Sequence, residues 1–213
     1  TEYLSGGIDV KNRNKFVFLA AIALLCLPLV AGAVVEKKSG TEYPDEVTVE
    51  AGGESHSLVV TGVGLREKTI MKVDVYTIVS YVAADAALAG DDLGLALQDY
   101  DGVKQIRMDL RRSFSRDKLC GAFTGVIDKN FEDQSAFASD TDVFLAYFER
   151  DAEDGDVLVF TYVPGQGLRT TLNGEEKGTI TNVEFVKALW SVWFGKKPAN
   201  GGLKKNLLAE LGD

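Results

Sequence analysis

The chain has 213 residues, of which 46% are hydrophobic and 26% charged, and its formal net charge at pH 7 is −9. This length supplies one globular core, since domains commonly run about 100 to 200 residues. The negative charge repels phosphate backbones, and no basic stripe with interleaved aromatic residues offsets it. We therefore expect no nucleic-acid partner.

The first 33 residues have the pattern of a secretory signal. An uncharged stretch at residues 16–35 ends with small residues suited to a cut after Ala33, and it follows the basic residues Lys11, Arg13 and Lys15. About 20 apolar residues also suffice to span a bilayer, so an uncleaved anchor is the alternative, and it would be the chain's only membrane contact. The pattern predicts an exported, periplasmic protein.

The remaining chain is expected to hold one domain. Residues 34–45 are mixed, polar and contain Gly40 and Pro44, which is typical of a linker. The domain is then predicted to span residues 46–213. A single cysteine remains after the signal, Cys120, which excludes an intramolecular disulfide and is expected to be a buried apolar residue.

Alternating apolar residues predict the first strands. Short strands are expected at residues 47–49 and 57–63, a long one at 69–82 and a half-buried one at 103–112. The long strand has one apolar face, while its other face is mixed and contains Lys72, Asp74, Tyr76 and Ser80. A strand with one apolar and one mixed face is expected in the wall of a cleft that has polar groups at one end.

Helical spacing then alternates with further strand patterns. Helices are predicted at residues 115–130, 142–151, 181–195 and 203–211, and strands at 156–163 and 168–172. Ser115 and the capping box from Thr181 to Glu184 begin two of the helices, and Gly195 ends one. Asn173-Gly174 predicts a hairpin turn. Strands interrupted by helices without regular βαβ alternation indicate an α+β fold with an antiparallel sheet.

The usual catalytic constellations are missing from the sequence. His56 is the only histidine, which excludes a metal site built on two or more histidines and leaves Cys120 without a histidine partner. The pair Gly62-Val-Gly64 lacks the third glycine of a dinucleotide loop and no helical pattern follows it. We expect neither a metal nor an organic cofactor.

Arg66 is the strongest candidate for a binding residue. It follows a bend that Gly62 and Gly64 permit, between two apolar strands, where a guanidinium can offer several donors to a carboxylate or an enolate oxygen. The alternative is a surface arginine at the end of a strand.

A series of motifs around Arg66 resembles the chalcone isomerase-like family. The motifs occur in the family's order over about residues 47–211 and are Gly62-Val-Gly-Leu-Arg66, Asp74-Val-Tyr76-Thr-Ile-Val-Ser-Tyr81-Val, Val163-Pro-Gly165-Gln-Gly167, Asn173-Gly174, Glu184-Phe185, Trp193-Phe-Gly195 and Leu203-Lys-Lys-Asn-Leu-Leu208. The chain looks like an exported bacterial member. The resemblance implies an open-faced β-sandwich, in which a layer of helices covers a large antiparallel sheet with a ligand cleft between them.

The resemblance also implies roles for individual residues. In the family's enzymes an arginine after the first glycine-rich bend stabilises developing negative charge, and Arg66 matches it. Tyr76 stands where the enzymes carry a threonine, and its hydroxyl could donate to an oxyanion. Lys118 lies near a lysine that lines the enzymes' cleft. Val192 stands where the enzymes have a hydroxyl near the end of a late helix, unless Ser191 substitutes for it.

Tyr81 is the last candidate ligand-binding residue. Tyr76 and Tyr81 are an odd number of positions apart, so they should face opposite sides of a regular strand, and Tyr76 shares the mixed face.

Three functions are compatible with these residues. The favoured one is binding of a fatty acid or a similar small amphipathic anion, without chalcone cyclisation, because several cleft positions of the enzymes are changed. The first alternative is an isomerase or intramolecular lyase acting on a phenolic or enone substrate, in which Arg66 and Tyr76 are catalytic. The second is an interaction scaffold whose cleft is filled by side chains. The oligomeric state is not predicted.

Overall fold

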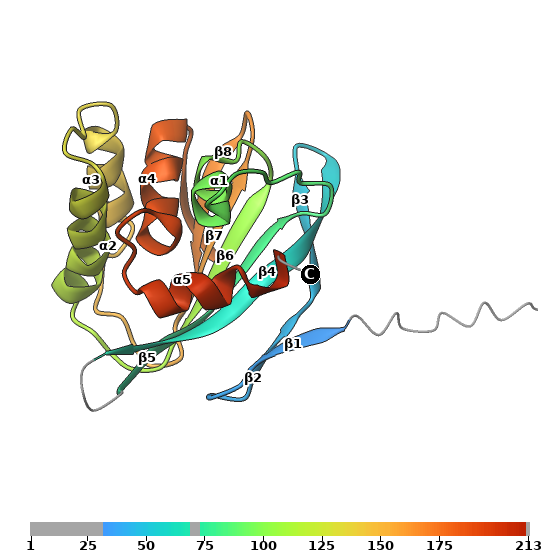
Figure 1. Cartoon of the computed structure of the whole chain (residues 1–213). Coiled ribbons are helices and arrows are strands. Elements are labelled where there is room, and N and C mark those ends of the chain that lie inside the picture. Colours follow the sequence, from blue (N-terminus) through green and yellow to red (C-terminus); the bar gives the residue numbers. More distant parts are fainter. Residues whose placement is uncertain (1–31, 69–72, 212–213) are drawn as a thin grey trace, which may run out of the picture. The chain divides into compact units, whose positions relative to one another are not determined.

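The computed structural model describes residues 32–68 and 73–211 and contains a seven-stranded antiparallel sheet. Each strand pairs with the next in the chain, so the sheet is a meander (Figure 1). Its strands are β3 (Glu46–Ala51), β4 (Glu54–Lys68), β5 (Val73–Ala83), β6 (Lys104–Leu110), β7 (Val157–Val163), β8 (Gly167–Leu172) and β9 (Glu175–Ile180). The turn between β8 and β9 is the predicted one, because Asn173 and Gly174 both have positive φ angles, of 53° and 80°.

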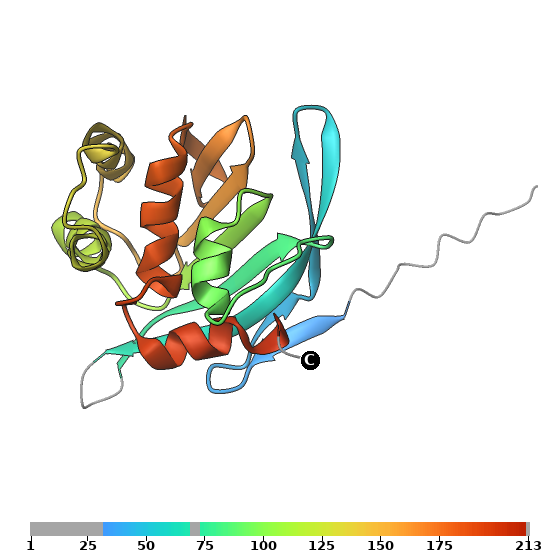
Figure 2. The ribbon, with the colours of Figure 1, turned by 45° about the horizontal axis from the view of Figure 1, so that its top comes forward.

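The helices gather on one side of the sheet, as Figure 2 shows. Their bounds are α1 (Leu93–Asp99), α2 (Arg116–Asn130), α3 (Ala138–Ala146), α4 (Val183–Phe194) and α5 (Gly201–Leu207), and a 3₁₀ turn follows at Ala209–Leu211. The large core between the helices and the sheet takes residues from all five helices and from six of the seven strands, β4 to β9. We call this side of the sheet the helical face and the opposite side the outer face.

Strand β5 is buried on both faces, which explains its long apolar run. Tyr76, Ile78 and Val82 belong to the core on the helical face. Val79 and Tyr81 belong to a smaller core on the outer face. The tyrosines therefore point to opposite sides, as their odd spacing predicts.

A hairpin packs on the outer face where the sequence suggested a linker. Strands β1 (Ala33–Glu36) and β2 (Thr41–Pro44) pair with each other, and Tyr43 of β2 is only 2% exposed. Its hydroxyl donates to a carboxylate oxygen of Asp109 at 2.8 Å and lies 2.8 Å from the hydroxyl of Thr77. The interpretation of residues 34–45 as a linker was therefore wrong, because one buried aromatic residue fixes this polar segment to the sheet. The expected signal lies outside the described residues over positions 1–31.

Two glycines of β4 allow α5 to lie directly on the sheet. A β-carbon on Gly62 would come within 2.2 Å of the backbone oxygen of Asn206, and one on Gly64 within 2.4 Å of Leu203 Cδ1. Strand β4 is continuous here, and its pairing with β5 has a register shift between Val60 and Gly62 and another between Arg66 and Glu67. The expected bend is therefore a β-bulge, and the glycines serve the contact between strand and helix.

Other helix boundaries differ from the sequence patterns. The helix α1 was not predicted, and the helix expected at residues 142–151 is α3, which begins four residues earlier. The cap of α4 is Asn182, whose side chain accepts from the Glu184 N–H, so the capping box at Thr181 does not form. The Ser115 cap of α2 and the burial of Cys120 are confirmed.

Candidate functional site

Arg66 and Tyr76 are directly opposite each other on neighbouring strands. The register of β4 and β5 pairs the two residues, and Tyr76 points to the helical face. Residues in register on antiparallel strands share a face and have β-carbons about 4.5 to 5.5 Å apart. The structure therefore brings the arginine and one of the two predicted tyrosines together under the helical layer.

Tyr76 is held from the core side by Trp193 of α4. The indole Nε1 of Trp193 donates to the phenolic oxygen of Tyr76 at 3.2 Å, and Tyr76 is 9% exposed. Burial raises the pKa of Tyr76, while the hydrogen bond from Trp193 and the positive charge of Arg66 partly oppose this rise. The hydroxyl is therefore protonated at neutral pH and can donate.

Arg66 is half-buried and keeps most of its donors. One guanidinium nitrogen, Nη1, donates to the carbonyl oxygen of Glu67 at 2.5 Å. The carboxylate of Glu67 pairs instead with Lys38. Within residues 32–68 and 73–211, no carboxylate lies at ion-pair distance from Arg66. A guanidinium has five N–H donors, so this group retains capacity for an anion.

The structure does not bring Tyr81 and Lys118 to this pair. Tyr81 lies on the outer face, where its hydroxyl donates to the carbonyl oxygen of Pro44 at 2.9 Å. Lys118 is exposed in the first turn of α2. Tyr81 cannot act in a site on the helical face, because the alternation of the strand turns it away.

The end of α4 offers no free hydroxyl. Val192 is 4% exposed and apolar, and the hydroxyl of Ser191 donates to the carbonyl oxygen of Ala188 at 2.7 Å, inside its own helix. Ser191 therefore does not replace the hydroxyl that the family's enzymes carry near this position.

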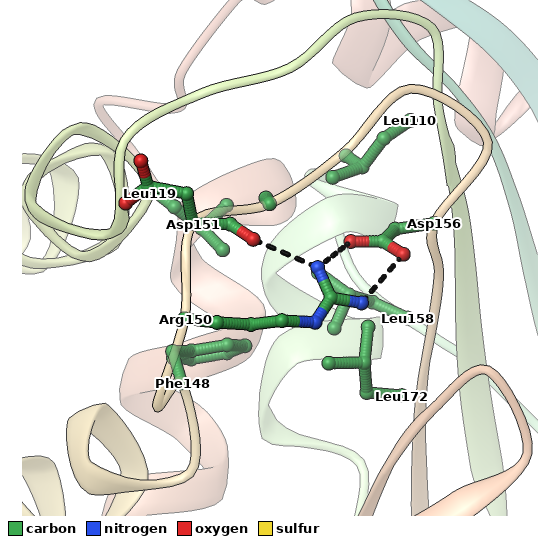
Figure 3. A pocket seen from close by; sticks show the side chains of 9 residues that line it. Leu110, Leu119, Phe148, Arg150, Asp151, Asp156, Leu158 and Leu172 are labelled. Carbon is green, nitrogen blue, oxygen red and sulfur yellow. Dashed lines mark hydrogen bonds and ion pairs between the residues drawn. The ribbon is translucent and has the colours of Figure 1, made fainter.

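Apolar side chains continue from Tyr76 across the sheet. Leu110 of β6 is paired with Tyr76, and it lines a small cavity of about 10 Å³ together with Leu119, Phe148, Leu158 and Leu172. Figure 3 shows Arg150 and Asp156 facing each other at this cavity. A volume of this size holds about one water molecule, so the cavity is a gap in packing and not a ligand site as it stands.

Asp156 lies in the wall of this cavity, and its carboxylate accepts several hydrogen bonds. The guanidinium of Arg150 contacts both carboxylate oxygens at 2.9 Å, and the Asn173 amide donates at 2.8 Å. Burial alone would raise the pKa of Asp156, but the hydrogen bonds outweigh it and lower the pKa to about 2. The group is thus a structural carboxylate at neutral pH.

Trp193 and Leu110 are the site residues that the sequence analysis did not single out. Trp193 was named only as part of the motif Trp193-Phe-Gly195, although a buried indole usually needs an acceptor for its N–H, which was an available signal. The place of Leu110 beside Tyr76 depends on strand register, which no local pattern in the sequence specifies.

The described residues contain no cluster of three or more histidine, cysteine, aspartate or glutamate side chains suited to a metal ion. Among their helices, none is long and apolar enough to cross a bilayer.

Comparisons with known proteins agree with this architecture. A solved structure of a fatty-acid binding protein from Arabidopsis thaliana superposes with a TM-score of 0.66 at 18% sequence identity, covering 83% of this chain and 96% of that one. This likeness shows a shared fold. No curated protein matches the sequence.

The family model described as chalcone isomerase-like matches residues 35–209. The match covers most of the chain, including most of the hairpin on the outer face, and it accords with the curled antiparallel sheet under a helical layer. The family resemblance and the fold expected from the motifs are therefore confirmed: the chain belongs to the chalcone isomerase-like family.

Proposed function

We propose that this protein binds a fatty acid or a similar small amphipathic anion, with its carboxylate held by Arg66 and Tyr76. The observation that carries the proposal is their cross-strand pairing on the helical face. The fatty-acid binding described for the Arabidopsis protein of the same fold supports it by analogy.

The two side chains supply complementary donors to a carboxylate. Arg66 contributes charge and several N–H groups, and Tyr76 contributes a neutral hydroxyl that burial keeps protonated. A charge-assisted hydrogen bond in a site partly shielded from water contributes about 1.5 to 3 kcal/mol. This pair can therefore hold a headgroup without a metal or a histidine.

The hydrocarbon tail runs from Tyr76 over Leu110 toward Leu158 and Leu172. Strands lie about 4.8 Å apart, so a path from Tyr76 on β5 to Leu172 on β8 covers about 14 Å. The small cavity beside Leu110 lies on this path and is lined mostly by apolar side chains. Because it holds about one water molecule, the tail must widen it by moving side chains of α2 or of the segment that follows α3.

Binding is favoured over cyclisation of a chalcone. An isomerase reaction would use Arg66 and Tyr76 to stabilise an enolate or phenolate oxygen. The late-helix hydroxyl that the enzymes use has no counterpart, because Val192 is apolar and Ser191 is bonded within α4. We therefore propose a binding protein, and we expect no conversion of a 2′-hydroxychalcone. Its place of action is proposed to be outside the cytoplasm, on the pattern of residues 1–33.

Binding of laurate to the delipidated full chain tests the anchor. We expect Arg66→Gln to weaken binding roughly 10- to 100-fold, and Tyr76→Phe roughly tenfold, measured by calorimetry. The matched control is Arg112→Gln, which removes the same charge from an exposed arginine over the ring of Phe114. Laurate binding that is absent, or equally strong in all three variants, would overturn the proposal.

The path of the tail has its own test. Leu119→Trp adds an indole to the wall of the small cavity, so it should weaken laurate at least tenfold and leave hexanoate within about twofold, as expected for blocked apolar burial. Val143→Trp is the control, since Val143 is 47% exposed on α3. Equal loss for both acids would place the tail elsewhere.

A further inference from the structure

A row of polar side chains crosses the outer face of the sheet, on the side away from Arg66 and Tyr76. The strand registers pair Gln105 of β6 with Thr161 of β7, Thr161 with Arg169 of β8, and Arg169 with Thr179 of β9. Arg169 alternates with Leu168 and Thr170, which are fully buried on the helical face. Its side chain therefore belongs to the outer face, flanked by two threonines.

Arg169 is unusual among the arginines that the structure describes. Arg66, Arg107, Arg111, Arg112, Arg116 and Arg150 each have a hydrogen bond, an ion pair or an aromatic ring as partner. Arg169 has none of these within the described part of the chain, although it is half-buried. Partial burial of a guanidinium without a hydrogen-bond partner is unfavourable, because the group loses part of its hydration. An acceptor from a ligand would compensate this loss.

This arginine lines a hollow on the outer face of the sheet. The hollow has a volume of about 210 Å³ and is lined by Ala51, Thr161, Val163, Gln166, Gly167, Arg169, Glu176 and Thr179. We call it the outer hollow. This volume is about twenty times that of the small cavity beside Leu110, and it is enough for a molecule of a few carbon atoms.

The polar residues that line the outer hollow include both hydrogen-bond donors and an acceptor. The Gln105 amide donates to the hydroxyl oxygen of Thr161 at 2.9 Å, which leaves the Thr161 proton free to donate elsewhere. Glu176 lines the same hollow beyond ion-pair distance from Arg169. The hollow thus offers cationic and hydroxyl donors together with a separate anionic acceptor.

We propose that the outer hollow is a second binding site, for a small carboxylate that also carries a hydroxyl or an ammonium group. Arg169 holds the carboxylate, with the hydroxyls of Thr161 and Thr179 on either side. Glu176 accepts from the hydroxyl or ammonium group. The site lies on the face opposite the fatty-acid site, so it is independent of that function.

Three four-carbon acids test this chemistry on the ¹⁵N-labelled full chain by NMR titration. L-malate carries a hydroxyl, L-aspartate an ammonium group, and succinate neither. We expect malate or aspartate, or both, to shift the amides of Thr161, Arg169 and Thr179 at concentrations at which succinate binds at least fivefold more weakly. The stronger of the two acids identifies the donor that Glu176 prefers.

Two variants separate the roles of the charged groups. Arg169→Gln should weaken the preferred acid roughly 10- to 100-fold, and Glu176→Gln should reduce its advantage over succinate to within about twofold. Arg169→Gln should leave laurate binding unchanged, and Arg66→Gln should leave the acid titration unchanged. The proposal is overturned if none of the acids shifts these amides at millimolar concentration, or if binding persists undiminished in Arg169→Gln.

Discussion

Trp193 donates its indole N–H to the phenolic oxygen of Tyr76, across 3.2 Å and between α4 and β5. Indole is a donor only, so this bond occupies a lone pair of the phenolic oxygen and leaves the Tyr76 proton for another acceptor. Both side chains are buried, and Trp193 also packs against the rings of Phe123 and Phe160. The hydroxyl of Tyr76 is therefore oriented from inside the core.

Replacing Trp193 with Phe should weaken laurate binding roughly three- to tenfold. The ring still fills much of the core, but Tyr76 loses the bond that orients its hydroxyl, which is worth about 0.5 to 1.5 kcal/mol. Because Trp193 acts through Tyr76, the same change in a Tyr76→Phe background should have little further effect, within about twofold. Calorimetry of the two single variants and the double variant measures this coupling.

Trp190→Phe is the matched control for this change. Trp190 lies one turn earlier on the same helix, is fully buried, and has an indole nitrogen with no hydrogen-bond partner among the described residues. Its removal should leave laurate affinity unchanged within about twofold. Equal weakening by both substitutions would mean that Trp193 supports only the packing of α4.

Much of the sheet was predictable because the patterns that indicate its strands and turns involve residues close together in the sequence. Alternation along β6 and the Asn173-Gly174 turn concern neighbouring residues, and both appear in the structure as expected. The hairpin β1–β2 and helix α1 were not predictable in this way. Each is short, and each depends on contacts remote in sequence, such as those of Tyr43 with Thr77 and Asp109.

The candidate site was predictable only in part. Arg66 and Tyr76 were found through motif order and strand alternation, but their direct pairing follows from a register that includes two shifts along β4 and β5. A one-residue difference in register turns a side chain to the other face. The placement of Tyr81 on the outer face was predictable, because it depends on alternation along one strand and not on register.

The buried Lys104 of β6 should make the stability of the fold depend on pH. It is 1% exposed, and its amine donates to the carbonyl oxygens of Leu97 and Gln98 at the end of α1, at 3.1 and 2.8 Å. Burial lowers its pKa to about 7, against the opposing charges of Asp99 and Asp101, and Lys187 adds to the lowering. The tyrosine Tyr162 and the ring of Trp190 also face the amine.

Stability should therefore rise between pH 7 and pH 9. In this window the unfolded chain keeps the proton on Lys104, while the folded chain loses it. Because the unfolded state then binds more protons, its free energy relative to the folded state increases with pH. We expect the free energy of unfolding to increase by about 2 kcal/mol over this range, from urea denaturation of the full chain. Lys104→Met should remove the increase, whereas the exposed Lys205→Met should keep it. The assignment fails if both variants retain the full increase.

Gly62 and Gly64 of β4 should differ in their tolerance of a side chain, because Gly62 faces backbone atoms and Gly64 faces the end of a flexible side chain. A methyl group on Gly62 would lie 2.2 and 2.6 Å from backbone atoms of Asn206 and Leu207, and Gly62 has a φ of +155°, which side chains rarely adopt. A methyl group on Gly64 would clash only with the end of the Leu203 side chain, at 2.4 Å. The first clash requires α5 to move off the sheet, and the second requires a new rotamer.

Gly62→Ala should therefore reduce the free energy of unfolding by at least about 3 kcal/mol, and Gly64→Ala by about 1 to 2 kcal/mol. Gly121→Ala on α2 is the control, since nothing lies within 4 Å of the added methyl group and alanine favours a helix, so it should increase stability by up to about 1 kcal/mol. Urea denaturation measures all three. Equal losses at Gly62 and Gly64 would show that α5 can shift on β4, and the glycines would then not fix its position.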